Sequence, residues 1–464
     1  MPDELGAIAR TGPRRLPAGS ARVEPVRVLH IPYTYFPDPP GGTEVYVAGL
    51  VGGLRRAAAG IGGAVAAPAA GEREYEYDGT PVYRFAAGGG AALAQAYGAP
   101  DLGAAQSFAA VLARVRPDIV HLHARSAAVS ERLVDCARDI GAKVVFTYHT
   151  PTVSCARGTM LHLGRSPCDG VLDRRRCTAC VLAGHGVPAP LRGLLARTPE
   201  PVGCGLARAG LAGGAFTALR LPALIGAAQR RFHALMRKTD RVVAVCGWVR
   251  DVLLANGVAA SKLVLCRHGL PVRSPPPPPP SPPAAGPLRL GYFGRLDPVK
   301  GADLLVEALR RLPDAPVRLD LFGVTQPGGE AYAAALERAA AADPRVALRP
   351  ALAPGEVAAA MRRCDLVAVP SRGMETGPLV VLEAFAAGTP VLGSRLGGIA
   401  ELVADGVDGI LVEPASPAAW ASALAALLGA PERLARLRRG IRPPRTMDDV
   451  AGEMAALYRA VLAA

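Results

Sequence analysis

Aromatic residues are scarce in this chain of 464 residues, where Phe, Tyr and Trp together make up 5%. Long apolar runs are scarce as well. The stretch nearest to a membrane span, AGLAGGAFTALRLPALIGAA (209–228), is interrupted by Arg220 and Pro222, so we interpret it as helical and interfacial rather than spanning. Residues 1–24 lack the apolar core of a secretory signal. We predict a disordered tail there and a cytoplasmic protein.

Cysteines are few and odd in number, with nine in the chain. Without a secretion signal we expect them to be reduced, so disulfides are not the default. Gly and Pro are abundant, at 53 and 44 residues, but they follow no period, which excludes a collagen-like chain and argues against a wholly disordered one. Apolar residues reach 50%, and this length predicts two or three domains with large cores.

Acidic residues are in deficit only in the first part of the chain. Residues 1–273 hold 33 of the 53 basic and 19 of the 39 acidic residues, which gives +14 and leaves 20 of each sign in 274–464. A basic first part favours an anionic partner such as a phosphate-bearing lipid, an acidic sugar or a nucleic acid, while a coding bias toward Arg explains it equally well. Contact with the inner face of a membrane through 189–238 is one hypothesis that follows.

Short apolar segments alternate with helical patterns in the first part. The segments VRVLHI, DIVHLHA, KVVFTYH and RVVAVC begin at residues 26, 118, 143 and 241. Helices are expected from the N-cap Thr43, over 127–139, and up to Gly257. This alternation predicts a parallel sheet covered by helices, in a domain over 25–272.

The composition breaks at RSPPPPPPSPPAAGP (273–287), which predicts a semi-rigid linker. Strands and helices then alternate again over 288–445, and an amphipathic helix over 446–464 is expected to pack back on the first domain. The predicted fold class is therefore α/β, with two doubly wound, Rossmann-like domains facing a central cleft. In this architecture ligands bind at the carboxyl ends of the strands.

Two glutamates, Glu375 and Glu383, stand around a Gly-Pro in METGPLVVLE (374–383). A strand is expected to end at Pro370, and a helix to start near Pro378, because Pro suits the first helical turn. Either glutamate alone would be interpreted as a solvated surface group. The strand end, the Gly-Pro start and an otherwise uncharged apolar helix favour a ligand site instead.

The start of this helix offers the backbone amides of Gly377, Leu379 and Val380 to the same crevice. Free amides and the helix dipole favour an anion. Glu375 and Glu383 would then accept hydrogen bonds from hydroxyls on either side of that anion.

Two cations are predicted at the same sheet edge, in GYFGRLDPVKG (291–301). Arg295 offers a planar fork to phosphate oxygens and Lys300 a mobile point charge. Together they would stabilise a diphosphate leaving group without a metal. Two surface cations at a strand–helix junction are the alternative.

In the first domain, Gly41 and Gly42 precede a helix and would allow a ligand close to the backbone. No P-loop pattern follows them. His149 ends a predicted strand and would face the cleft.

These motifs together resemble the family 4 retaining glycosyltransferases of GT-B fold, over most of 26–463 and most specifically over 290–412. The resemblance implies transfer of a sugar from a UDP- or GDP-sugar, with retention, to a saccharide, lipid-linked or small-molecule acceptor, an anionic one included. It also implies a role in cell-envelope polysaccharide synthesis, a front-side mechanism and no catalytic metal. Nucleic acid is not an expected partner.

The same resemblance implies roles for individual residues. Glu383 binds the ribose, Glu375 holds hydroxyls of the donor sugar, and Arg295 and Lys300 bind the diphosphate. The remaining expected donor or reaction-centre residues are Gly41, Gly42, His149, Thr376, Gly377, Pro378 and Leu379.

Four cysteines, Cys155, Cys168, Cys177 and Cys180, lie within 26 residues, in an expected insertion over about 151–185. A CxxC pair with two further thiols suits a closed, structural Zn²⁺ site or an iron–sulfur cluster. Unconnected thiols are the alternative. Similar insertions occur in a subset of the family, and we expect this one, with the basic helical segment over 186–238, to shape acceptor binding.

Two rival functions stay open at this point. One is a nucleotide-sugar epimerase or a phosphorylase on the same architecture, which donor hydrolysis or phosphate dependence would distinguish. The other is a metal-containing nucleic-acid-binding protein, based on the basic first part and the cysteines. The lack of a paired CxxC and of a basic surface rich in aromatics argues against it.

Overall fold

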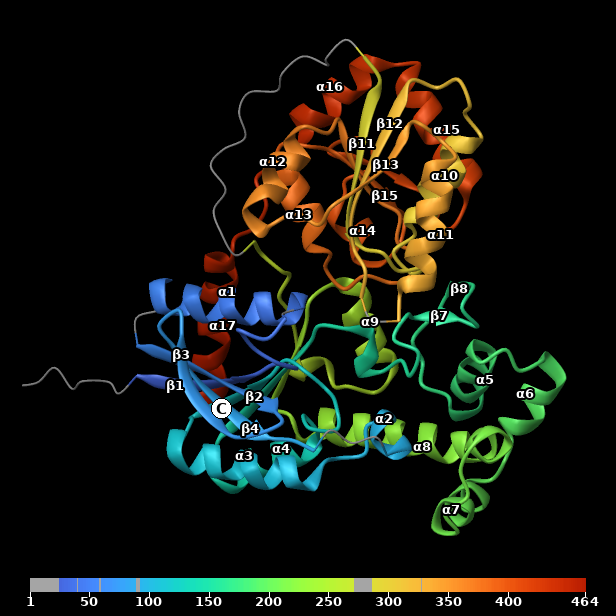
Figure 1. The fold of residues 1–464 in the computed structure, drawn as a ribbon. Coiled ribbons are helices and arrows are strands. Elements are labelled where there is room, and N and C mark those ends of the chain that lie inside the picture. Colours follow the sequence, from blue (N-terminus) through green and yellow to red (C-terminus); the bar gives the residue numbers. More distant parts are fainter. Residues whose placement is uncertain (1–24, 40, 58–59, 89–91, 271–285, 327) are drawn as a thin grey trace, which may run out of the picture.

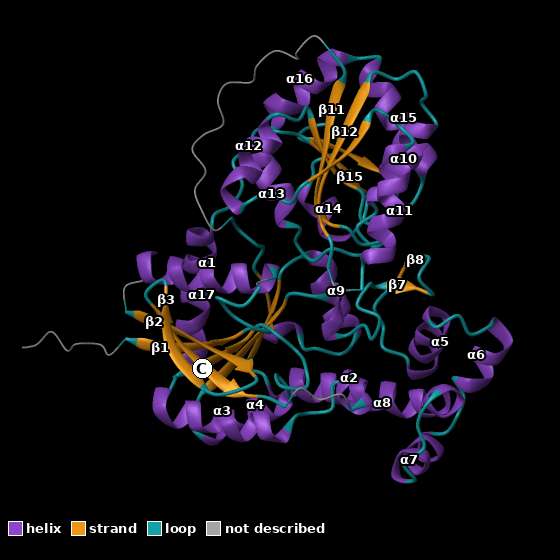
Figure 2. Ribbon diagram, viewed as in Figure 1, coloured by secondary structure: helices purple, strands orange, loops and turns teal. Residues whose placement is uncertain are grey.

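The computed structural model describes residues 25–39, 41–57, 60–88, 92–270, 286–326 and 328–464. The tail predicted for 1–24 and most of the predicted linker lie outside these ranges. Within them the chain forms two α/β domains, each with one largely parallel sheet between layers of helices (Figure 1, Figure 2). The predicted α/β class is confirmed.

The first domain has a sheet of eight strands in the order β10-β9-β6-β5-β1-β2-β4-β3. Neighbouring strands are parallel except for β3 and β4, which form a hairpin. The bounds are β1 Val26–Ile31, β2 Ile61–Ala69, β3 Arg73–Tyr77, β4 Thr80–Ala86, β5 Ile119–Leu122, β6 Lys143–Tyr148, β9 Arg241–Ala244 and β10 Leu263–Leu265. Alternate residues enter opposite cores: Val144 and Phe146 point to one face and Val145 to the other.

Helices cover both faces of this sheet. They are α1 (Gly42–Ala57), α2 (Leu93–Ala96), α3 (Leu102–Val115), α4 (Glu131–Asp139) and α9 (Gly247–Ala255), with short 3₁₀ turns at 151–153 and 260–262. One expected start and one expected N-cap are wrong. Helix α4 begins after its N-cap Ser130 rather than at Ala127, and Thr43 lies inside α1, where Glu44 binds the amide of Gly41 instead (2.8 Å).

The cysteine-rich and basic stretches of the sequence lie in the segment between β6 and β9. It contains a small hairpin of β7 (Leu161–His162) and β8 (Ser166–Pro167), followed by α5 (Arg174–Gly184), α6 (Ala189–Leu195), α7 (Glu200–Arg208) and α8 (Gly214–Lys238). Helices α5, α6 and α7 extend sideways from the body of the first domain (Figure 1). Among the helices that the structure describes, none has the length and apolar content needed to cross a bilayer.

The second domain has six parallel strands in the order β13-β12-β11-β14-β15-β16. The strand bounds are β11 Leu288–Arg295, β12 Val317–Val324, β13 Val346–Arg349, β14 Leu366–Val369, β15 Val391–Ser394 and β16 Gly409–Val412. The helix bounds are α10 Ala302–Arg310, α11 Glu330–Ala341, α12 Val357–Arg362, α13 Leu379–Ala386, α14 Gly397–Leu402, α15 Pro417–Leu428 and α16 Pro431–Gly440. The order reverses between β11 and β14, and a crevice opens at such a point.

The last helix, α17 (Met447–Leu462), leaves the second domain and packs beside α1 (Figure 1). Its apolar face shares the core with Leu50 and Leu54. Close approach depends on Gly53, because a Cβ there would meet the Cβ of Ala451 at 2.9 Å. The end of the chain therefore ties the second domain to the first.

Candidate functional site

A cavity of about 400 Å³ opens at the carboxyl edge of the second sheet. Its walls come from the ends of β11, β12 and β14 and from the start of α13, the elements around the reversal of strand order. Six of the predicted residues line it, namely Arg295, Lys300, Glu375, Pro378, Leu379 and Glu383. Residues 88 positions apart in sequence thus meet because parallel strands end at one edge.

Glu375 is held as a carboxylate inside this cavity. Its Oε1 accepts hydrogen bonds from Lys300 Nζ (2.7 Å) and from Ser371 Oγ (2.8 Å). Burial acts to raise the pKa of Glu375, but the Lys300 ammonium and the Ser371 hydroxyl outweigh it, so the pKa lies below its ordinary value. Lys300 and Glu375 therefore present one fixed pair of opposite charges to a ligand.

Glu383 contrasts with Glu375, because its carboxyl has no hydrogen-bond partner in the described part of the chain. It lies on the second turn of α13 and lines the cavity. Burial raises its pKa. A partly buried acceptor without a donor is costly unless a ligand supplies one, so Glu383 is aimed at hydroxyls from outside the protein.

The mouth of the cavity combines a cation with an apolar wall. Arg295, at the end of β11, donates through Nη1 to Gln326 Oε1 (2.7 Å) and keeps further N–H groups. Phe293 and Phe322 stack in parallel with ring centroids 4.9 Å apart, and both line the cavity. Val324 extends the same apolar wall. The site can therefore take a flat apolar group beside an anionic one.

Helix α13 starts where the two domains touch. Pro378 is its N-cap, and the residues before it face the first domain. Thr376 Oγ1 donates to the carbonyl of His149 (2.6 Å), and His268 Nδ1 donates to the carbonyl of Gly377 (3.0 Å). A Cβ at Gly377 would meet His268 Nδ1 at 2.5 Å, so the close approach requires glycine.

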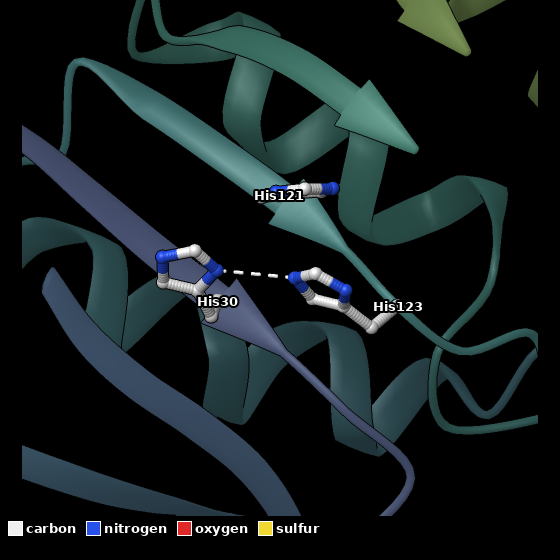
Figure 3. A group of neighbouring side chains, drawn as sticks. All are labelled: His30, His121 and His123. Carbon is white, nitrogen blue, oxygen red and sulfur yellow. Dashed lines mark hydrogen bonds between the residues drawn. The ribbon is translucent and has the colours of Figure 1, made fainter. Parts of the chain in front are cut away.

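From Gly377 a row of imidazoles runs into the core of the first domain. His268 Nε2 lies 3.3 Å from His149 Nδ1, His149 Nε2 lies 3.0 Å from His123 Nδ1, and His123 Nε2 lies 3.0 Å from His30 Nδ1. Figure 3 shows its inner end, where His30 of β1 meets His123 after β5. Burial lowers the pKa of all four histidines, to about 3 for His30.

The carbonyl of Gly377 assigns the tautomers of this row. A carbonyl only accepts, so His268 carries its proton on Nδ1, and each neutral ring behind it must do the same. The row then ends at His30 Nε2, which is buried and has no partner within the described residues. Neutral rings with fixed protons make a rigid wall behind the crevice.

A metal site is the other chemistry that three histidines suggest. In the part of the chain that the structure describes, His30, His121 and His123 are the one group whose ligand atoms lie within 4.8 Å of one another. The ring of His121, however, lies over that of His123 (centroids 3.9 Å), and its nitrogens bond to Tyr458 Oη and Thr147 Oγ1, both at 2.7 Å. Both nitrogens of His121 are thus used in hydrogen bonds to other side chains.

Five predicted site residues do not line the cavity, namely Gly41, Gly42, His149, Thr376 and Gly377, and the last two lie at the domain interface just before α13. Gly41 precedes α1 and Gly42 is its first residue, and the amide of Gly41 binds Glu44. The side chain of His149 belongs to the imidazole row rather than to the cavity wall, while its carbonyl holds Thr376. Their roles at the reacting centre stay predictions.

The four predicted metal-binding cysteines, Cys155, Cys168, Cys177 and Cys180, line one small cavity of about 40 Å³. Their thiols do not form a group with ligand atoms within 4.8 Å in the described ranges. Burial raises the pKa of Cys177 to about 11, and Cys180 Sγ accepts from the amide of Leu163 (3.2 Å). The donor set suits Zn²⁺ or an iron–sulfur cluster in kind, and metal binding here stays a prediction.

Sequence reasoning missed the residues that join the domains. Glu401 of α14 accepts from the amides of Gly247 (2.7 Å) and Trp248 (2.9 Å) at the start of α9, and from Arg267 Nη2 (3.1 Å). Trp248 Nε1 donates to the carbonyl of Glu375 (2.8 Å). No local signal pointed to Glu401, because the helix start that it binds, that of α9, lies 153 positions away in sequence.

Two family models match the chain. "Glycosyl transferases group 1" matches residues 287–430, and "Glycosyltransferase Family 4" matches residues 40–187. D-inositol 3-phosphate glycosyltransferases are similar: that of Segniliparus rotundus is 39% identical over 181 residues, which cover 37% of this chain and 40% of that protein. That of Nocardia farcinica is 40% identical over 161 residues, covering 33% and 36%. The chain spans about two fifths of the length of these relatives.

Solved structures show the same fold at low identity. HepE of Anabaena in complex with UDP and glucose has a TM-score of 0.62 at 17% identity, covering 94% of this chain and 100% of that one. Sucrose-phosphate synthase of Thermosynechococcus elongatus has a TM-score of 0.65 at 18% identity, covering 94% and 99%. The GT-B fold expected from the sequence is thereby confirmed.

Proposed function

The chain belongs to the group 1 glycosyltransferases of family 4, and from this premise we propose that it transfers a glycosyl group from a nucleotide-diphosphate sugar to an acceptor. The observation that carries this proposal is the partnerless carboxyl of Glu383 in one cavity with Arg295 and Lys300. A carboxylate for hydroxyls and two cations for phosphates match the two ends of a nucleoside diphosphate.

The donor lies along the cavity from the apolar wall to the domain interface. The base lies on the apolar wall of Phe293 and Phe322, and the ribose hydroxyls donate to Glu383. Arg295 and Lys300 bind the diphosphate, next to the start of α13. UDP is the first nucleotide to test, because HepE of Anabaena was solved with UDP and glucose.

Transfer proceeds with retention at the anomeric carbon. The bond from the anomeric carbon to the leaving phosphate oxygen breaks while the acceptor oxygen approaches from the same face. The acceptor proton passes to the departing phosphate oxygen, so no protein nucleophile is required. Lys300, Arg295 and the helix start stabilise the negative charge that develops on the diphosphate.

Glu375 positions Lys300 and the donor sugar. Its carboxylate keeps the ammonium of Lys300 at 2.7 Å and has a second oxygen free for a sugar hydroxyl. The backbone of Glu375 is itself fixed, because its carbonyl accepts from the amide of Gly398 (2.7 Å) and from Trp248 Nε1.

The test is a thermal-shift panel of UDP-glucose, GDP-mannose and ADP-glucose on the wild type and on Glu383→Ala. Glu337→Ala, on the exposed face of α11, is the matched control. One donor at 100 times its Kd should stabilise the wild type and the control by about 2.7 kcal/mol, and Glu383→Ala by much less. If no donor stabilises the wild type, the transferase proposal fails.

A turnover assay with the donor identified by that panel separates the rival enzyme. A phosphorylase would consume inorganic phosphate, and its product release would depend on the phosphate concentration. A transferase would release the nucleoside diphosphate in a manner that depends on the acceptor and not on phosphate.

A further inference from the structure

Two further cavities lie on the first domain, away from the donor cavity, and one residue lines both. A polar cavity of about 400 Å³ lies between the first domain and the insertion. An apolar groove of about 590 Å³ lies between α5, α6 and α8. Tyr97, which follows α2, lines the polar cavity and the apolar groove, so the two are adjacent.

The polar cavity carries positive charge and unused hydrogen-bonding groups. Arg125 lines it, donates to the carbonyls of Val153 (3.0 Å) and Ala228 (2.9 Å), and has no carboxylate within ion-pair distance in the described ranges. Gln95 and Gln229 line the same cavity, and Gln95 Oε1 and Gln229 Nε2 are buried without a partner among the residues described.

Carboxylates are absent from the described lining of both cavities. Burial lowers the pKa of Arg125 and the charge of Glu131 opposes this, but Glu131 is itself paired with Arg231 (3.9 Å). A guanidinium without a carboxylate partner, next to a buried unpaired N–H donor, suits a phosphate group.

The apolar groove differs in chemistry and in exposure. Leu182, Leu195 and Leu221 line it, and Leu191 lines it with 48% of its surface exposed. Such an apolar surface on a protruding helical arm needs an apolar occupant. The helices around it carry basic side chains such as Arg192, which suits an occupant with an anionic end.

We propose that the two cavities form one binding site for a lipid-linked acceptor, with its phosphate in the polar cavity and its hydrocarbon chain in the apolar groove. This inference rests on the proposed function, because it assigns the acceptor class of that transferase. The charge of one cavity, the apolar lining of the other and the shared Tyr97 all match a single amphiphile.

The path from the polar cavity to the donor side is lined with hydroxyls. Tyr33 and Thr152 line the cavity, and Tyr33 Oη lies 3.1 Å from Thr150 Oγ1. Thr150 follows His149, whose carbonyl binds Thr376 beside the donor cavity. A sugar attached to the lipid phosphate would extend along these hydroxyls toward the anomeric carbon.

The experiment measures binding of farnesyl phosphate to the full chain by calorimetry, below its critical micelle concentration. Farnesol and inorganic phosphate are the tail-only and head-only probes. Farnesyl phosphate should bind at least tenfold more tightly than either one, because both cavities are filled at once. Equal affinity for farnesol would overturn the phosphate site, and equal affinity for inorganic phosphate would overturn the groove.

Two neighbouring leucines provide the matched pair for the groove. Leu191→Gln changes a lining residue and should weaken farnesyl phosphate binding about tenfold, the loss expected for one buried apolar side chain. Leu194→Gln changes a residue that is 68% exposed and does not line the groove, and it should alter the affinity less than twofold. Equal effects would contradict the proposal.

Gln229→Leu tests the polar cavity, because replacing Arg125 would also remove the donor to the carbonyls of Val153 and Ala228. Removing an unpaired buried amide should leave the melting temperature unchanged or raised, while the affinity for farnesyl phosphate falls several-fold. Unchanged affinity would overturn the phosphate site. A UDP-glucose thermal shift on the same samples separates the inferences: donor binding with no preference for farnesyl phosphate refutes the lipid site alone.

Discussion

The two walls of the crevice are built from opposite chemistry. The wall of the second domain holds full charges on loops, with Lys300 bonded to Glu375 at 2.7 Å and with Arg295 beside them. The wall of the first domain holds neutral imidazoles, from His268 to His30, in one hydrogen-bonded row. Charged groups stand where a ligand must be bound, and uncharged rigid groups stand behind it.

The two domains therefore contribute differently to the cleft. A charged side chain in a crevice is stabilised by a ligand of opposite charge. The charged groups of the second domain are therefore fully paired only when the ligand is bound. Within the described residues, every ring nitrogen of the imidazole row has a hydrogen-bond partner except Nε2 of His30. The first domain is therefore preorganised. Protonation of its histidines should change the stability of this domain rather than the affinity for the donor.

The largest expected effect is a difference in acid stability between the domains. Histidines with lowered pKa bind protons more weakly in the fold than in the unfolded chain. Their stabilisation is therefore complete above pH of about 6.5 and falls as the pH decreases, by about 1.4 kcal/mol per pH unit for each ring. With five such rings, the four of the row and His121, the first domain should lose several kcal/mol between pH 7 and pH 5.

The chain offers one tryptophan in each domain as a reporter, Trp248 in the first and Trp420 in the second. Urea unfolding at pH 7 and pH 5 is followed by Trp248 in Trp420→Phe and by Trp420 in Trp248→Phe. Equal losses of unfolding free energy in the two domains would contradict the expected difference in acid stability.

Removing the central cation should have the next largest effect. Lys300→Met leaves Glu375 partly buried without its ion pair and leaves the departing diphosphate with less positive charge. The turnover number should fall about 10²- to 10³-fold. Arg318→Met, exposed on β12, is the control and should keep its rate. The measurement is release of nucleoside diphosphate at saturating donor, and a loss below tenfold would contradict this role.

A smaller effect is expected at the glycine that supports Glu375. Gly397 has a φ of +52°, and a Cβ there would meet the backbone N and O of Glu375 at 3.1 Å. Gly397→Ala should lower the free energy of unfolding by about 1–2 kcal/mol and should also weaken donor binding. Gly406→Ala, at φ +77° with open space around it, should cost only the backbone strain. If donor binding fell equally in both variants, support of Glu375 by Gly397 would be refuted.

The smallest effect is expected at an exposed link between the domains. Arg56 Nη2 of α1 lies 2.7 Å from Asp448 Oδ1 of α17, and the side chains are 53% and 33% exposed. Arg56→Gln should change the free energy of unfolding by less than about 1 kcal/mol, because water screens exposed ion pairs. Chemical denaturation measures this change. A larger loss would mean that charge, rather than the core around Gly53, holds α17 in place.

Much of the second domain could be predicted from the sequence, because its site residues stand next to recognisable strand ends and helix starts. Arg295 and Lys300 follow one strand, and Glu375 precedes one helix, so the rule for parallel strands brings them together without further information. The first domain gave weaker signals. Gly41 and Gly42 looked like a ligand-binding turn, but the amide of Gly41 binds Glu44, only three residues away.

The sequence by itself determined the α/β class, the alternation of strands and helices, and the charged residues at one sheet edge. These follow from periodicity and from strand ends, which are local properties. Only the tertiary structure decided the imidazole row, which joins residues from His30 to His268, and the meeting of two cavities at Tyr97. Such features depend on which distant segments become neighbours, and no short-range pattern encodes the distances between them.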